Sequence, residues 1–420
     1  MTLKIFPCVQ KIFTPFVVTI MAIVLLSMPV FVSESMAREE EHSLSKKLDL
    51  SLYGFVSTSY TQNFNNPSTG INNMRSFDGD SNSFRPNNAQ LVFEKGANGD
   101  GSLEDRAGFR LKLNFGEDAK FSGGSGADDF DFQEAYVQFI APIGNGLTIQ
   151  AGRMNTLIGY EVIESYVNPN FSRSFMFGMG EPFTVTGLRG SYDFNDYVSF
   201  AASVINDFTG LQVETAGGIG TGNSSKSIEA LLSINPMNNV AVSLFGFWGP
   251  EGARGASNSE RILFGGILDV QATDKAEVVI EAYYGNQANP GGAGTTMARW
   301  GGVAGYFIYD FTDQWGARVR AEIFEDASGS QSCAGTGAGL GNALVCAVPP
   351  ATPGTLAAAS IIPGGQTLWE MTYTLQFKPV PNLITRVEFR YDESDQKTFQ
   401  DGVGVSDNQS TLAFEGIFLF

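Results

Sequence analysis

The chain has 420 residues, of which 43 % are hydrophobic and 17 % charged, and it contains 49 Gly and 34 Phe. A net charge of −18 at pH 7 argues against a nucleic-acid partner, and a mean hydropathy near zero argues against a bundle of membrane-spanning helices. Many glycines and aromatic residues with few charges are typical of a transmembrane β-barrel, whose strands alternate a lipid face with a wet face.

The N-terminus carries the pattern of a secretory signal peptide, which we expect to cover residues 1–37. Lys4 and Lys11 precede a long apolar run, Ile12–Val32. Small residues follow at Ser35 and Ala37, where a signal peptidase would require them. Because the apolar run is long for a signal peptide, a helical membrane anchor is the alternative.

Residues 38–47 form a short charged lead, and residues 48–420 are expected to form one barrel. From residue 48 onward, stretches of about ten residues alternate apolar with polar or small side chains, as two-faced strands do. Leu111 and Leu113, for example, alternate with their charged neighbours. Sixteen strands are expected, at 48–60, 87–95, 106–115, 130–141, 147–154, 182–193, 197–206, 227–234, 240–249, 261–271, 276–285, 299–310, 315–325, 367–378, 383–392 and 410–420.

The connections between these stretches alternate between short and long. The short ones mostly carry Asn, Asp, Gly or Pro, which turns select, whereas the long ones include 61–86, 155–181 and 326–366. Short periplasmic turns and long external loops are typical of a bacterial outer-membrane barrel. We therefore predict an all-β fold, a transmembrane antiparallel up-and-down β-barrel of about sixteen strands in the bacterial outer membrane.

The third external loop, Arg153–Glu181, is long and partly apolar. We predict that it folds inward and narrows the bore of the barrel; an external loop packed on its neighbours is the alternative. Within it, Tyr160–Tyr166 is expected to form about two helical turns with both of its glutamates on one face. The predicted pore constriction consists of Glu161, Glu164, Arg153 and Arg173.

Charged residues recur on the wet faces of the predicted strands. Basic residues that face the acids of the loop would create a transverse electric field, which sorts solutes by charge. The alternative for each of them is a solvated side chain of the barrel wall without such a role. The predicted basic pore wall consists of Arg110, Lys112, Arg189, Arg318, Arg320, Arg386 and Arg390. Inward-facing acids are expected at Glu134, Glu229, Glu277, Glu281, Glu322, Glu370, Glu388 and Glu415.

Cys333 and Cys346 lie in one Gly/Ala/Pro-rich segment and are predicted to form a disulfide that closes an exposed loop. Two free thiols, or two ligands of a metal site, are the alternatives. Since His42 is the only histidine and lies far away in sequence, we expect no metal. The lack of further histidines leaves no Ser–His pair on any strand, and no phosphate-binding loop motif is present, so we expect neither an enzyme nor a cofactor.

The last stretch ends on Phe420 with aromatic residues at even spacing, which resembles the terminal-strand signal that the outer-membrane insertion machinery reads. The sequences LYGFVSTSY, DFQEAYVQF and GRMNTLIGYEVIESYVNPNFSRS are similar to the OmpL-like β-barrel porin family, and the similarity spans the chain that follows the signal peptide. This resemblance implies an outer-membrane pore for small hydrophilic solutes and brings no catalytic residues with it.

The expected function is passive diffusion of small hydrophilic solutes and ions through a water-filled barrel. The expected partners are the lipid bilayer, the insertion machinery and, by analogy with other sixteen-stranded porins, two further copies in a homotrimer. One alternative is a non-conducting barrel whose long external loops serve adhesion or ligand binding. Another is a substrate-specific channel. A continuous water path past the third loop would separate the porin from the non-conducting barrel.

Overall fold

The computed structural model describes residues 50–122, 129–208, 225–251, 259–288, 297–331 and 365–420. The predicted signal peptide 1–37, the charged lead 38–47 and the predicted disulfide between Cys333 and Cys346 all lie outside the described residues. The chain divides into two units at residue 47, and the described residues all belong to the second unit, Leu48–Phe420.

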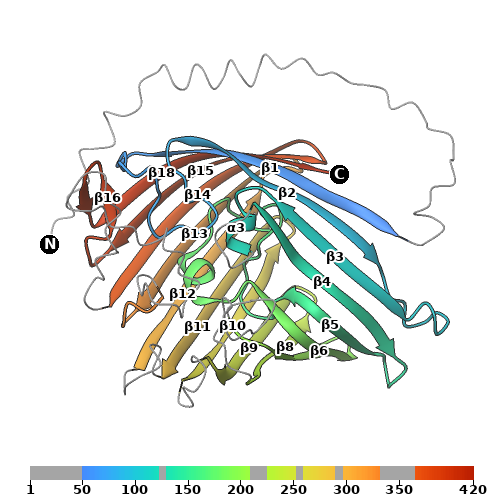
Figure 1. The fold of residues 1–420 in the computed structure, drawn as a ribbon. Helices are drawn as coiled ribbons and strands as arrows, with labels where there is room; N and C mark the ends of the chain where they lie inside the picture. Colours follow the sequence, from blue (N-terminus) through green and yellow to red (C-terminus); the bar gives the residue numbers. More distant parts are fainter. Residues whose placement is uncertain (1–49, 123–128, 209–224, 252–258, 289–296, 332–364) are drawn as a thin grey trace. The chain divides into compact units, whose positions relative to one another are not determined.

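Sixteen strands form one closed antiparallel barrel (Figure 1), which confirms the predicted fold class and strand number. Consecutive strands pair with each other, and β1 closes the ring against β18, where Val56 lies opposite Phe418. The barrel strands are β1 (Ser51–Asn63), β2 (Ser83–Lys95), β3 (Ala107–Phe115), β4 (Phe130–Ala141), β5 (Leu147–Asn155), β6 (Thr184–Asn195), β7 (Val198–Ile205), β8 (Ser227–Met237), β9 (Val240–Pro250), β10 (Glu260–Thr273), β11 (Ala276–Ala288), β12 (Met297–Asp310), β13 (Trp315–Asp326), β14 (Gln366–Val380), β15 (Leu383–Ser394) and β18 (Asn408–Leu419).

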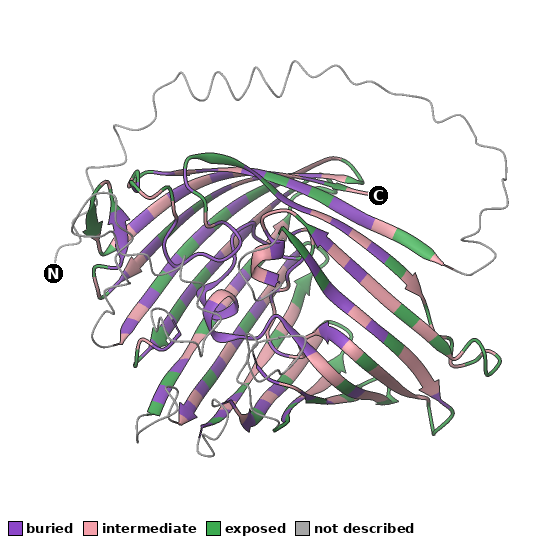
Figure 2. Cartoon of the chain, viewed as in Figure 1, coloured by how far each residue is buried: buried purple, intermediate pink, exposed green. Residues whose placement is uncertain are grey.

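Each strand has one outward and one inward face, because successive side chains of a strand point to opposite sides. Along β13, Arg320 is fully buried and Glu322 nearly so, whereas the alternating residue Ile323 is 56 % exposed. Figure 2 shows the same banding of buried and exposed positions on the other barrel strands. Because many of the exposed residues are large and apolar, as at Phe264 and Val303, the outer surface suits contact with lipid.

In the part of the chain that the structure describes, four short elements lie outside the barrel wall: α3 (Ala119–Ser122), the π-helix η2 (Met176–Gly180), and the two-stranded hairpin of β16 (Phe399–Asp401) and β17 (Gly404–Ser406). The hairpin occupies part of a connection that the sequence suggested was a plain loop. Among the described residues, the structure holds no helix that is long and apolar enough to cross a membrane.

The main hydrophobic core lies inside the ring of strands. Its wall members alternate with the lipid-facing residues, and its other members come from the connections that enter the interior. The wall contributes Val185, Ile205, Phe245, Phe247, Leu263, Val279, Tyr283, Ala298, Trp300, Ala304, Tyr306, Phe324 and Leu368. The connections contribute Met74, Ile158, Phe175, Met176, Met179, Phe208 and Phe399. A sixteen-stranded barrel is too wide for its wall side chains to meet, so inserted chain segments complete this core.

Candidate pore constriction

The connection between β5 and β6, residues 156–183, reaches the far side of the ring (Figure 1). The backbone N–H of Phe175 donates to Glu322 on β13 at 2.7 Å, and that of Phe171 donates to Glu388 on β15 at 2.7 Å. In the closed strand order β13 is eight strands from β5 in either direction. We refer to residues 156–183 as the inner segment.

Carboxylates of the wall satisfy the backbone of the inner segment. Glu322 accepts the N–H groups of both Phe175 and Met176, and Glu388 accepts those of both Phe171 and Ser172. Buried N–H groups of an irregular segment have no ladder partner and need an acceptor elsewhere. The inward acids on β13 and β15 thus anchor backbone rather than line free solvent.

Arg320 is the central cation of this arrangement. Its guanidinium contacts Glu161 of the inner segment at 2.7 Å and Glu370 of β14 at 2.6 Å, and it donates to the carbonyl of Ser172 at 2.6 Å. None of the three charged side chains is exposed. A charge so far from water is stable only while its partners are in place, so Arg320 ties the inner segment to the wall.

The predicted helix over Tyr160–Tyr166 is wrong, because the structure contains turns and bends there. The side chain of Asn168 accepts from the N–H of Val162 at 2.9 Å and donates to the carbonyls of Val162 and Glu164. Such side-chain bonds to the backbone compete with helical ones. The two predicted acids therefore do not share a face.

Glu161 and Glu164 reach different walls. Glu161 binds Arg320 on β13, whereas Glu164 accepts from Lys112 on β3 at 2.5 Å and from Gln133 on β4 at 2.8 Å. Both acids are buried and paired. Their expected role at a constriction is a prediction that these contacts do not test.

The two flanking arginines also have internal partners. Arg153 pairs with Asp131 at 2.7 Å and donates to Thr184 at the base of the inner segment. Arg173 donates to the carbonyls of Val162, Ile163 and Phe171, so it fastens the inner segment to itself. The structure therefore places the four predicted constriction residues in four separate sets of contacts.

Every cation of the predicted basic wall is paired with a carboxylate. In these pairs every carboxylate belongs to a strand, Asp310 being the last residue of β12. The pairs are Arg110 with Glu134 at 3.4 Å, Lys112 with Glu134 at 2.7 Å, Arg189 with Glu229 at 2.7 Å, Arg318 with Asp310 at 2.7 Å, Arg320 with Glu370 at 2.6 Å, Arg386 with Glu415 at 3.1 Å and Arg390 with Asp392 at 2.6 Å.

Sequence reasoning missed several interior residues. Arg75, from the connection between β1 and β2, is buried against Asp392 of β15 at 2.6 Å. Tyr283 and Trp300 project from β11 and β12 and donate to carbonyls of the inner segment, at Met176 and Gly180. Arg75 lies in a connection expected to be external, so no signal pointed to it. The positions of Tyr283 and Trp300, two aromatic residues on the wet faces of predicted strands, were a weak signal of an inserted segment.

Glu181, at the end of the inner segment, is the least compensated acid of the site. It is fully buried, and neither of its carboxylate oxygens has a hydrogen-bond donor among the described residues. Burial, together with the neighbouring carboxyls of Glu281 and Glu161, raises the pKa of Glu181 well above its ordinary value of 4.5. Glu181 therefore holds a proton more tightly when the inner segment is in place than it would in water.

Gly159 makes room for that carboxyl. It has φ +90°, and a Cβ built there would lie 1.9 Å from Oε2 of Glu181. Gly159→Ala is expected to destabilise the inserted inner segment by about 2–5 kcal/mol, since left-handed backbone and overpacking both add to the cost. Trypsin cleavage after Arg173, which is buried, reports release of the segment. The matched control is Gly70→Ala, at φ +73° with open space around it, where cleavage after Arg173 should not increase.

Comparisons with known proteins agree with this architecture. The profile of the family described as "Putative beta-barrel porin-2, OmpL-like" matches residues 49–420. No curated protein sequence matches the chain. Among solved structures, the high-pH structure of Pseudomonas putida OprB is similar with a TM-score of 0.56 and 11 % identity, covering 90 % of this chain and 96 % of that one.

Two further solved barrels are similar. The anion-selective porin from Comamonas acidovorans has a TM-score of 0.54 and 10 % identity, covering 88 % of this chain and 99 % of that one. OmpT of Vibrio cholerae in its trimer form has a TM-score of 0.53 and 9 % identity, covering 88 % and 99 %. At such identities the likeness concerns the fold alone.

Proposed function

Because the chain belongs to the OmpL-like beta-barrel porin-2 family of the bacterial outer membrane, we propose that it is a porin through which small hydrophilic solutes and ions diffuse passively. The inner segment, anchored through Arg320 and the wall carboxylates, would set the width of the passage. No reaction and no cofactor enter this proposal.

The observation that carries the proposal is an unequal filling of the barrel interior. From β13 to β18 the inward side chains are buried over most of each strand, as the charged row of β15 illustrates. On β8, β9 and β10, by contrast, the inward residues nearer the short turns are partly exposed, including Ser233, Ser243 and Ile267. The latter three lie opposite one another in register, so they form one water-accessible row. A passage would run along this side.

Planar-bilayer recordings of the refolded barrel test the proposal. Heat-modifiable mobility on a gel first establishes that the protein is folded. Reproducible conductance steps are the expected result. Silence from a folded protein would overturn the porin function.

The large apolar core inside the ring favours a second candidate, a non-conducting barrel that serves adhesion or ligand binding through its external loops. Twenty buried apolar residues pack together there, more than a wide aqueous channel needs. A substrate-specific channel is the third candidate. Solute-dependent block of the conductance would favour that reading over unselective diffusion.

We also propose that the barrel assembles as a homotrimer in the outer membrane. The similarity to a barrel described in a trimer form supports this. Chemical cross-linking in native membranes should then give a three-chain product. If cross-linking gave single chains alone, the proposed homotrimer would be contradicted.

A further inference from the structure

The charges that face the barrel interior are unevenly compensated. All seven cations of the predicted basic wall are in ion pairs with carboxylates. An ion pair contributes little net field at a distance, because its two charges cancel. The field in the passage therefore depends on the charges that are left over.

Two of the remaining charges are the acids Asp269 on β10 and Glu277 on β11. Asp269 lies two residues from the inward position Ile267, and Glu277 lies four residues from the inward position Glu281. Because side chains an even number of residues apart share a face of a strand, both acids lie on the inner face. Both side chains are partly exposed, and neither has an ion-pair partner among the described residues. Arg318 lies in the same register row as Glu277, two strands away through Ile308, and it already binds Asp310 at 2.7 Å.

The acidic character continues where the inner segment meets the same strand. Tyr160 of the inner segment donates its backbone N–H to Glu281 at 3.1 Å. Glu181 lies next to this carboxyl, fully buried and with both oxygens lacking a donor among the described residues. Burial without hydrogen-bond donors destabilises a carboxylate, and the binding of a proton or of a passing cation relieves this cost. Together with the neighbouring carboxyls of Glu281 and Glu161, this is a second sign, independent of Asp269 and Glu277, that this part of the interior is poor in positive charge.

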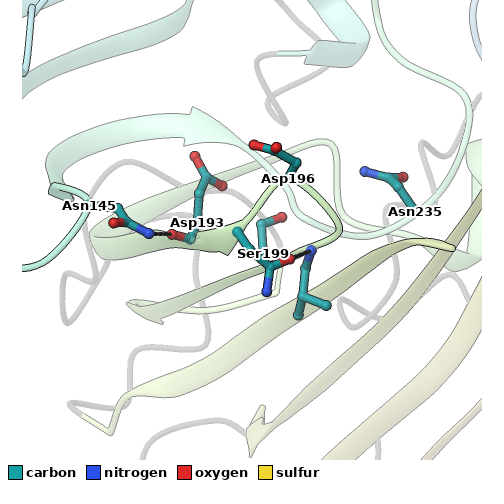
Figure 3. A pocket seen from close by; sticks show the side chains of 7 residues that line it. Asn145, Asp193, Asp196, Ser199 and Asn235 are labelled. Atoms are coloured by element: carbon teal, nitrogen blue, oxygen red, sulfur yellow. Dashed lines mark hydrogen bonds between the residues drawn. The ribbon is translucent and has the colours of Figure 1, made fainter. Parts of the chain in front are cut away.

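The short-turn end of β6 and β7 also carries acids. Figure 3 shows the carboxylates of Asp193 and Asp196 at a hollow of about 350 Å³ whose other lining residues are mostly uncharged and polar. The side chain of Asn145 donates to the carbonyl of Asp193 at 3.0 Å, so the amide leaves the carboxylate free for solvent. The charges of Asp193 and Asp196 have the same sign as those of the acids deeper in the barrel.

We propose that the passage prefers cations, including small cationic solutes, and that Asp269 and Glu277 are the residues that set this preference. The proposal rests on the proposed porin function. Uncompensated acids in a narrow, low-dielectric passage concentrate cations and repel anions, and the effect weakens as salt screens it.

The test is the reversal potential of the refolded full-length barrel in a gradient of KCl across a planar bilayer. The wild-type potential should have the sign of cation preference. The double variant Asp269→Asn with Glu277→Gln should lose about half or more of the cation-to-anion permeability ratio. The matched control is Glu260→Gln, the same kind of change on β10 but at an exposed position of the outward register, and it should keep the wild-type ratio.

The outcomes are distinguishable. Anion preference in the wild type, or an unchanged ratio in the double variant, overturns this inference and leaves the porin function standing. Silence of folded wild-type protein overturns the porin function itself. Both substituted positions are partly exposed, so the variants should fold, and heat-modifiable mobility checks this for each of them.

Discussion

Arg320→Met is expected to release the inner segment and raise the conductance of the barrel. The substitution keeps most of the apolar stem of the side chain but removes the cation that the buried carboxylates of Glu161 and Glu370 both contact. Removing one partner of a buried ion pair typically costs about 3–5 kcal/mol. Since the hydrogen bonds between the strands do not involve this side chain, the loss should fall on the inner segment rather than on the barrel.

Single-channel recording is the measurement for this variant, and we expect larger and noisier conductance steps. Amide hydrogen exchange gives a second readout that does not depend on conduction. The N–H groups of Phe171 and Met176, which donate to wall carboxylates, should exchange faster in the variant. Wild-type protection at both sites, together with wild-type conductance, would show that Arg320 does not hold the segment.

Arg318→Met is the matched control. It removes the same charge from the same strand, two residues nearer the short turn. Among the described residues, Arg318 forms an ion pair with Asp310 alone, whose side chain is 53 % exposed, and ion pairs that reach solvent contribute about 0–1 kcal/mol. Exchange of the inner-segment amides should therefore match the wild type, and a shared effect of both variants would point to charge alone.

The wall of this barrel could be predicted from sequence because its signal is local. Period-two alternation along β13 already separated the wet Arg320 and Glu322 from the lipid-facing residues, and the burial of these positions agrees with it. Sixteen such stretches with alternating connection lengths led directly to the closed barrel. Strand ends were less certain, as at β2, which begins at Ser83 rather than at residue 87.

The interior could not be predicted in the same way, because its contacts join residues far apart in sequence. Arg320 meets Glu161 across 159 positions, and no alternation within either segment specifies that pair. The helix expected around Tyr160 was wrong because spacing alone ignores the bonds that Asn168 makes to the backbone. The acid Glu181 has a special environment because the inner segment buries it and because β11 brings Glu281 beside it.

Glu181 should make the position of the inner segment depend on pH. Burial and the carboxyls of Glu281 and Glu161 raise the pKa of Glu181 above the ordinary value of 4.5, so the inserted state binds a proton that the released state gives up. The resulting stabilisation is complete below the ordinary value and is lost as the pH rises through the raised pKa. Conductance should accordingly grow as the pH rises above the ordinary value of 4.5, as the segment is displaced.

Glu181→Gln separates this mechanism from other titrations. A glutamine has the same shape and no charge, and its amide can donate a hydrogen bond to a neighbouring carboxylate. The variant should resemble the acidic wild type at every pH, so its conductance should stay low and flat. A wild-type pH profile in this variant would assign the effect to another group.

Glu164→Gln provides the contrasting control within the same segment. Burial alone would raise the pKa of Glu164, but the neighbouring Lys112 outweighs it, and the pKa is lowered. Glu164 is therefore ionised throughout the range in which Glu181 titrates, and its loss removes an ion pair at every pH of that range. This variant should loosen the segment uniformly and keep the rise with pH. A carboxyl whose pKa is raised by burial and by neighbouring acids, as that of Glu181 is, couples the segment to the proton concentration, whereas Glu164 does not.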